Sequence, residues 1–149
     1  MNNAKLCYNK EKIKQEGIAV KARVAKEKEL VLLYHFEQSE RENQIKEVLS
    51  QLGMEWRVVL PEELGQTLGW CAGLHGFARR SDVETPTEIQ EEMMVFQGLT
   101  SKRLETLLAA FRQEKIAKVE LKAVITGTNQ SWTWRQLYEE LCKERNAVG

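Results

Sequence analysis

Two hydrophobic patterns recur along the chain, one typical of buried strands and the other of amphipathic helices. Residues 30–36 (LVLLYHF) and 93–96 (MMVF) are apolar runs without alternation, as in strands that are covered on both faces. Residues 56–60 and 119–126 also have strand character, and charged residues in the second run favour a place near a sheet edge. Together these runs predict a sheet of about four strands.

Segments with helical spacing lie between and after these runs. Residues 45–52, 104–111 and 134–141 carry apolar side chains three and four positions apart, which places them on one face of a helix. The chain therefore alternates strand and helix. This order predicts an α/β fold in a single domain, residues 29–149, with a mainly parallel sheet, helices on both faces and three layers. Residues 93–128 are the clearest strand-helix-strand unit.

Two helix starts carry an explicit capping signal. Ser39 with Glu42 and Thr133 with Gln136 each match the S/T-x-x-E/Q pattern of a capping box. In a capping box the hydroxyl accepts a backbone N–H three residues on, while the Glu or Gln side chain accepts the N–H of the cap residue. We therefore expect well-defined helix starts at both positions.

A third helix is predicted to begin at Pro61, and its composition is unusual. Gly65, Gly69 and Gly73 recur at every fourth position, and each costs roughly 1 kcal/mol of helix propensity relative to alanine. On a continuous helix the three glycines would form a flat stripe. Such a stripe predicts either an interface, including self-association, or close packing of the helix against a neighbouring element.

The first 28 residues differ from the rest in charge. They hold eight Lys or Arg and three Glu, which leaves 14 basic and 19 acidic residues in 29–149. Alternation in residues 18–24 predicts an added edge strand, paired with residues 5–8 as a hairpin, and partial disorder is the alternative. Without aromatic or arginine-rich patterning, this basic extension favours a solvated surface over a nucleic-acid-binding arm.

Composition narrows the class of protein. The chain has 149 residues, of which 42% are hydrophobic and 30% charged, with a net charge of zero. No apolar stretch has the length of a membrane helix, and the start lacks a secretory hydrophobic region, so we expect a cytoplasmic protein without membrane association. The three cysteines Cys7, Cys71 and Cys142 form no CxxC pair, which favours free thiols in a reducing compartment.

No motif in the sequence names a reaction. Cys71 and His75 lie one helical turn apart, but both fall on the apolar stripe of the predicted helix, so buried packing is preferred over a zinc or thiol–imidazole site. His35 lies inside a predicted strand and is interpreted in the same way. We expect no metal and no cofactor. Whether the protein is an enzyme stays open, with a non-catalytic role favoured.

The best candidate for a ligand site comes from sheet geometry. Loops that follow parallel strands gather at one edge of a sheet, where ligands usually bind. Here these would be residues 97–101 and 126–131, together with 37–39, and they bring hydroxyls, an amide and helix N-termini suited to a small anionic ligand. The alternative is that these residues only form caps and turns. The candidate ligand residues are Gly98, Thr100, Ser101, Thr126, Gly127, Thr128 and Asn129.

Three segments resemble a family of short bacterial proteins known only as a domain of unknown function. They are the glycine-rich segment 64–77 ending in G-F, the M-V-F-x-G strand, and the K-A-V-I-T-x-T-N-x-x-W segment. The resemblance covers about residues 30–141 and implies a bacterial cytosolic α/β domain. It brings no activity, cofactor or catalytic residue, and the basic start, residues 1–28, departs from the short start of that family.

These observations lead to one main hypothesis and two alternatives. The main hypothesis is a non-catalytic binding or regulatory module that recognises a protein partner or small polar ligand through the strand-end loops. The first alternative is a small enzyme acting at the same edge, with Thr126, Thr128 or Asn129 positioning the substrate. The second is a structural protein that self-associates through the glycine stripe.

Overall fold

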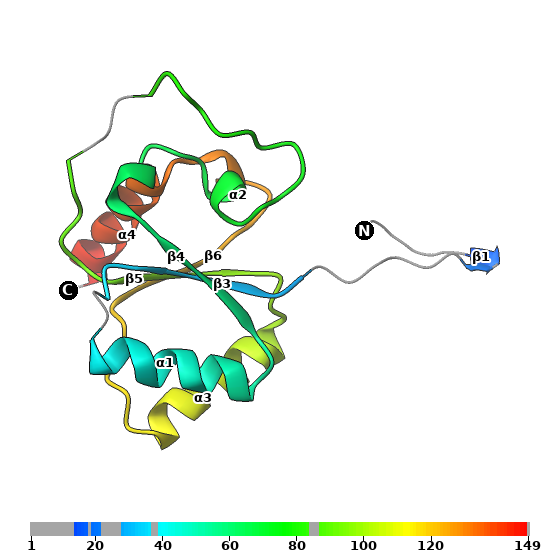
Figure 1. The fold of residues 1–149 in the computed structure, drawn as a ribbon, viewed down its shortest axis with the longest axis horizontal. Helices are drawn as coiled ribbons and strands as arrows, with labels where there is room; N and C mark the ends of the chain where they lie inside the picture. Colours follow the sequence, from blue (N-terminus) through cyan, green and yellow to red (C-terminus); the bar gives the residue numbers. More distant parts are fainter. Residues whose placement is uncertain (1–13, 18, 22–27, 37–38, 84–86, 149) are drawn as a thin grey trace.

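The computed structural model of the protein shows an open α/β sheet with helices on both faces, which confirms the predicted fold class (Figure 1). The main sheet consists of β3 (Leu30–Tyr34), β4 (Glu55–Val59), β5 (Met93–Gln97) and β6 (Leu121–Val124), in the order β4-β3-β5-β6. The structure describes residues 14–17, 19–21, 28–36, 39–83 and 87–148.

The sheet is mostly parallel, with one antiparallel pair at its centre. β3 runs parallel to β4, and β5 runs parallel to β6, whereas β3 and β5 are antiparallel. Each parallel pair is therefore one strand-helix-strand unit, and β6 lies at an edge as predicted.

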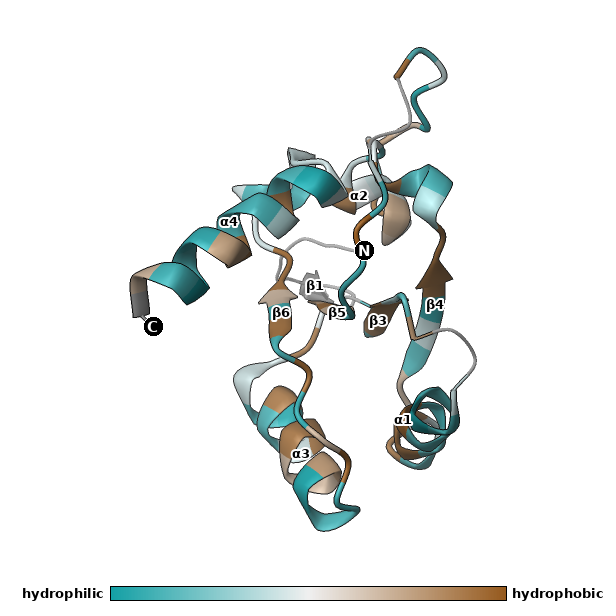
Figure 2. Ribbon diagram, turned by 90° about the vertical axis from the view of Figure 1, so that its left-hand side faces the viewer, coloured by the Kyte–Doolittle hydropathy of each residue, from teal (hydrophilic) through white to brown (hydrophobic). Residues whose placement is uncertain are grey.

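Two layers of helices cover the sheet (Figure 1, Figure 2). The helices on one face are α1 (Glu40–Gln51) and α3 (Ser101–Gln113), and those on the other are α2 (Leu68–Cys71) and α4 (Trp134–Val148). The short 3₁₀ helices η2 (Pro61–Glu63) and η3 (Asn129–Ser131) precede α2 and α4.

The central strands are buried on both sides. Val31 and Leu33 of β3 belong to the core cluster under α1 and α3, whereas Leu32 and Tyr34 belong to the cluster under α2 and α4. All five residues of β5 are buried. Successive side chains of a strand point to opposite faces, so burial on both faces explains the apolar runs without alternation.

An approximate two-fold axis at the centre of the sheet relates the two strand-helix-strand units. In the β3–β5 pair, Leu30 lies opposite Gln97, and the central residues of the two strands, Leu32 and Val95, lie opposite each other. The axis passes between these two central residues. Rotation about this axis exchanges β3 with β5, β4 with β6, and α1 with α3. The same rotation keeps α1 and α3 on one face, as Figure 2 shows.

Local hydrogen bonds repeat under this rotation. The N–H of Leu60 donates to Glu63 Oε1 at 2.9 Å before α2, and the N–H of Thr126 donates to Asn129 Oδ1 at 2.8 Å before α4. These side chains close equivalent turns, although one is a carboxylate and the other an amide. The two units therefore share turn geometry as well as strand order.

The start of α2 and the start of α4 meet across the two-fold axis. Thr67 and Thr133 form an isolated antiparallel bridge, and each hydroxyl accepts the backbone N–H three residues on at 3.1 Å. The N–H of Leu68 donates to the Trp132 carbonyl at 2.8 Å. The predicted capping box of Thr133 is confirmed, because Gln136 Oε1 also accepts the Thr133 N–H at 2.8 Å.

On the opposite face, two arginine–glutamate pairs cross between the units. Arg103 in the first turn of α3 donates to Glu29 at 2.7 Å and to a carbonyl just beyond α1. Arg41 in the first turn of α1 donates to Glu92 at 3.1 Å and to a carbonyl just beyond α3. Glu29 and Glu92 each directly precede a central strand, so the two contacts are equivalent under the rotation.

The continuous helix predicted from Pro61 is wrong. The chain forms η2, passes through buried Gly65, and starts the four-residue helix α2 after the cap Thr67. Gly69 is buried inside α2, whereas exposed Gly73 has a φ of 72° that ends it. Glycine weakens a helix and tolerates positive φ, so this spacing marks a folded-back segment, and the three glycines form no common stripe.

The N-terminal hairpin differs from its prediction. β1 (Lys14–Gly17) and β2 (Ala19–Lys21) pair antiparallel in a separate two-stranded sheet, so β2 adds no edge strand to the main sheet. The expected partner, residues 5–8, lies outside the described residues.

Gly69→Ala should destabilise the protein. A Cβ at Gly69 would lie 2.5 Å from the ring of Phe77, so either α2 or this ring must move. We expect a loss of about 1–3 kcal/mol in the free energy of unfolding, measured by urea denaturation.

Gly127→Ala is the matched control, because a Cβ there would meet nothing within 4 Å, and we expect a change within about 0.5 kcal/mol. Phe77→Ala added to Gly69→Ala should lose less stability than the sum of the two single variants. Purely additive losses would contradict the contact.

Candidate functional site

The antiparallel central pair separates the strand ends into two groups. β3 and β4 end at one edge of the sheet, and β5 and β6 end at the opposite edge. Of residues 37–39, which were expected to join the loops after β5 and β6, residues 37–38 lie outside the described residues, and Ser39 follows β3 on the side of the sheet away from those loops. Strand direction in the second unit was not evident from the local pattern, because the long segment between β4 and β5 allows either direction.

The predicted ligand residues lie at the β5–β6 edge, where many of their polar groups already have partners. Thr100 caps α3 by accepting the Arg103 N–H at 3.1 Å. Thr126 Oγ1 accepts the N–H groups of Thr128 and Asn129 at 3.2 and 3.1 Å. These bonds are the cap and turn contacts that the alternative interpretation expected.

The remaining predicted residues serve the same turns. Gly98 has a φ of 78° directly after β5, and Ser101 is the first residue of α3. The Asn129 amide donates to the Val124 carbonyl at 3.0 Å, and Gly127 has open space around its Cβ position. A ligand at this edge stays a prediction.

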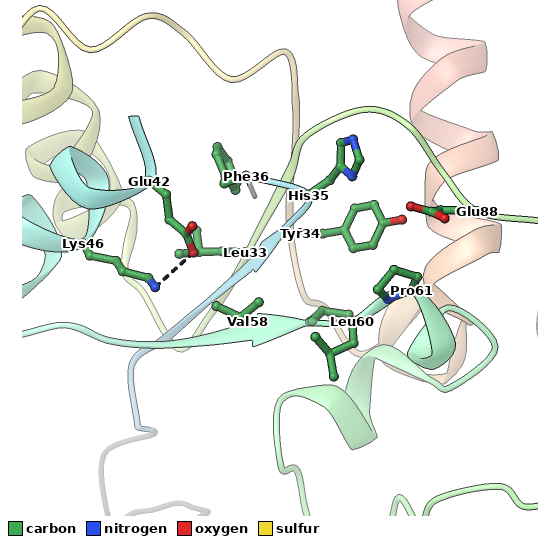
Figure 3. Close-up of a pocket in the computed structure, with 11 residues that line it drawn as sticks. Leu33, Tyr34, His35, Phe36, Glu42, Lys46, Val58, Leu60, Pro61 and Glu88 are labelled. Atoms are coloured by element: carbon green, nitrogen blue, oxygen red, sulfur yellow. Dashed lines mark ion pairs between the residues drawn. The ribbon is translucent and has the colours of Figure 1, made fainter. Parts of the chain in front are cut away.

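At the opposite edge, a cavity of about 380 Å³ opens where β3 and β4 end (Figure 3). We call it the β3–β4 cavity. Glu42 and Lys46 of α1 lie on one side of it, and His35 and Glu88 lie toward the other (Figure 3). Its lining residues are Leu33, Tyr34, His35, Phe36, Glu42, Lys46, Val58, Val59, Leu60, Pro61 and Glu88.

Glu42 is the most unusual residue of the cavity wall. Its side chain is 5% exposed, and Oε2 forms an ion pair with Lys46 Nζ at 3.0 Å (Figure 3). Oε1 is buried without a hydrogen-bond partner among the described residues. An unsatisfied buried acceptor costs about 1–3 kcal/mol, so its presence requires an explanation.

The capping box predicted for Ser39 and Glu42 is only half formed. Ser39 Oγ accepts the Glu42 N–H at 3.1 Å, as expected. The Ser39 N–H, however, donates to the Phe36 carbonyl at 3.3 Å, and no bond returns to it from the Glu42 carboxylate. The S-x-x-E pattern gave no signal for this site, because a local cap was a sufficient explanation for Glu42.

His35 and Tyr34 form another part of the wall. β3 ends at Tyr34, and His35 is partly exposed with a φ of 68°, so the prediction of a buried histidine inside the strand is wrong. Gly98 occupies the equivalent place after β5, also with positive φ. The Tyr34 hydroxyl donates to the Ile89 carbonyl at 2.7 Å, which attaches the segment before β5 to this wall.

Cys71 and His75 do not form a site. Cys71 is buried at the end of α2, but His75 lies beyond the helix and is exposed, so the expected burial is confirmed only for the cysteine. Burial raises the pKa of the Cys71 thiol to about 11, and the nearby Arg57 guanidinium opposes this shift only in part.

Two kinds of feature are absent from the described ranges of the chain. No group of three or more His, Cys, Asp or Glu side chains is arranged to hold a metal ion. No helix in that part of the chain is both long and apolar enough to cross a membrane.

Glu42→Met and Lys46→Met should change stability in opposite directions. Methionine at position 42 removes the unsatisfied buried acceptor and leaves Lys46, 29% exposed, within reach of water, so we expect a gain of about 1–2 kcal/mol. Lys46→Met leaves the buried carboxylate unpaired and should lose about 1–3 kcal/mol. Urea denaturation at pH 7 measures both. A loss of stability in Glu42→Met would show that the carboxylate supports the fold itself.

Thiol reactivity should separate Cys71 from Cys142. In a Cys7→Ser background, an aromatic disulfide reagent at pH 8 should modify partly exposed Cys142 rapidly and Cys71 only after unfolding, because burial keeps its thiol protonated. Cys71 also predicts a pH dependence of stability. Its thiol ionises near pH 8.5 in the unfolded chain, whereas burial raises its pKa to about 11 in the folded chain, so the free energy of unfolding should fall as pH rises from about 8.5 to 11. Rapid modification of both thiols in the folded protein would contradict the burial of Cys71.

Comparison with known proteins was informative for the second strand-helix-strand unit. Among curated proteins and among solved structures, nothing matched the chain. A family model does match part of the chain, from directly before β5 to the end of α4. This part contains two of the three segments that carried the expected resemblance, and the glycine-rich segment 64–77 lies outside it. The resemblance to a family of unknown function is thus confirmed: residues 92–148 match the model of the domain of unknown function DUF3783.

Proposed function

We propose that the protein is a non-catalytic binding module of the bacterial cytoplasm, which takes a small ligand into the β3–β4 cavity. Its volume of about 380 Å³ is at the lower end of the range for small-molecule sites. The buried free thiol of Cys71 is compatible with a reducing compartment. Recognition of a protein partner through the loops after β5 and β6 stays a prediction.

The observation that carries this proposal is the unsatisfied Oε1 atom of Glu42 in the wall of the cavity. Buried polar atoms in folded proteins nearly always have hydrogen-bond partners. An acceptor that lacks one beside a cavity is explained if a bound molecule supplies the donor. The position of the cavity agrees with this explanation, since ligands of α/β sheets favour the carboxyl ends of parallel strands.

The second unit provides a comparison inside the same chain. Arg41 and Arg103, in the first turns of α1 and α3, make the equivalent contacts between the units, so the residues that follow them, Glu42 and Leu104, are equivalent under the two-fold rotation. Leu104 is apolar and packs against the core cluster under α1 and α3. Glu42 is a buried carboxylate that lines the cavity instead. The difference between equivalent positions supports a specialised role for the first unit.

Blocking the cavity should abolish binding. Val58 on the edge strand β4 lines the cavity and is 39% exposed, so the large indole of Val58→Trp can fill the opening. We expect small-molecule fragments to shift the backbone amide NMR signals of His35 and Leu60 in the wild-type chain, and this effect should be lost in Val58→Trp.

Val124→Trp is the matched control. Val124 occupies the equivalent place on edge strand β6, is also 39% exposed, and does not line the cavity. This variant should bind fragments like the wild type. Fragments that instead shift the signals of Gly98 and Thr128 in both variants would contradict the cavity proposal and favour the β5–β6 edge.

A further inference from the structure

We infer that the ligand of the β3–β4 cavity carries a protonated amine on an apolar body, and that the Glu42 carboxylate accepts this amine. The inference rests on the proposed function and adds the chemical class of the ligand. It follows from the hydrogen-bonding capacity of the wall, its charge and the character of its remaining surface.

Hydrogen bonding requires a donor at Glu42. An ionised carboxylate only accepts hydrogen bonds, and one of its two oxygens already binds Lys46. The other oxygen has no partner, so it is suited to an N–H or O–H group and unsuited to a second acceptor. The terminal torsion of glutamate is broad, and a small rotation can turn the free oxygen toward the cavity.

Charge favours a cationic donor over a neutral one. The charged side chains of the wall are Glu42, Lys46 and Glu88, which together carry one net negative charge when histidine is neutral. A ligand ammonium neutralises this charge. Because Glu42 is almost fully buried, its hydrogen bond to an ammonium is screened little by water and is stronger than a bond between neutral groups.

The rest of the wall is suited to an apolar body. Seven of the eleven lining residues are Leu, Val, Phe, Tyr or Pro, so most of the wall beyond Glu42, Lys46, His35 and Glu88 is apolar. An anionic ligand would meet two carboxylates and only one ammonium group. The cavity therefore favours a cationic ligand, whereas the sequence predicts a small anionic ligand at the loops after β5 and β6.

A matched set of three compounds tests the inference. Phenethylamine, 2-phenylethanol and phenylacetate share one aromatic body and differ in the charge of the polar group. Their dissociation constants for the full chain are measured by NMR titration of the amide signals of His35 and Leu60. We expect phenethylamine to bind roughly tenfold or more tightly than the alcohol, and phenylacetate to bind weakest.

Variants of two carboxylates identify the acceptor. Glu42→Gln should reduce phenethylamine affinity to that of 2-phenylethanol, whose own affinity should change little. Glu88→Gln removes an exposed charge from the same wall and should change amine affinity less than about threefold, because water screens that site. Glu42→Met, which we expect to be well folded, should repeat the loss if Glu42→Gln is poorly folded.

The outcomes separate the inference from the function on which it rests. Equal affinity for amine and alcohol, or amine affinity unchanged in both Glu42 variants, would overturn the amine assignment while leaving cavity binding intact. If none of the three compounds shifts the cavity signals, the proposed binding function and the amine assignment both fail.

Discussion

The antiparallel hydrogen bonding of β3 to β5 is the interaction on which the remaining structure depends. It joins two parallel strand-helix-strand units with Leu32 opposite Val95 and buries both strands on two faces. Because the pair is antiparallel, a rotation relates the units, which places α1 and α3 on one face and α2 and α4 on the other. The contacts of Arg41 and Arg103 then cross between units at equivalent places.

Because of the same pairing, the carboxyl ends of β3 and β4 lie on one side of the sheet and those of β5 and β6 on the opposite side. The side chains at these two sides differ in chemistry. After β5 and β6, hydroxyl and amide groups such as those of Thr126 and Asn129 bond to nearby main-chain atoms. After β3 and β4, the Glu42 side chain faces a cavity and has one oxygen without a partner. The backbone is thus nearly symmetric, whereas the side chains at the two ends of the sheet differ in burial and hydrogen bonding.

Two similar local signals had different outcomes, and their surroundings explain why. Thr133 and Gln136 complete their capping box, because the Gln136 side chain stays exposed at the helix start and accepts the Thr133 N–H. Ser39 and Glu42 begin the same pattern, but Glu42 is buried between α1 and the end of β3, where Lys46 is its ion-pair partner. A capping signal predicts the helix start in both cases, yet the burial of the third residue depends on packing that local sequence does not contain.

The sequence by itself determined the fold class, the central place of residues 30–34 and 93–97, and the main helix starts, because hydrophobic period and capping are local properties. Only the tertiary structure decided that β5 runs antiparallel to β3, that the glycine-rich segment folds back after α2, and that Glu42 lines a cavity. These features depend on contacts between residues far apart in the chain. Local propensity leaves them open, and the free energy of packing selects among the alternatives.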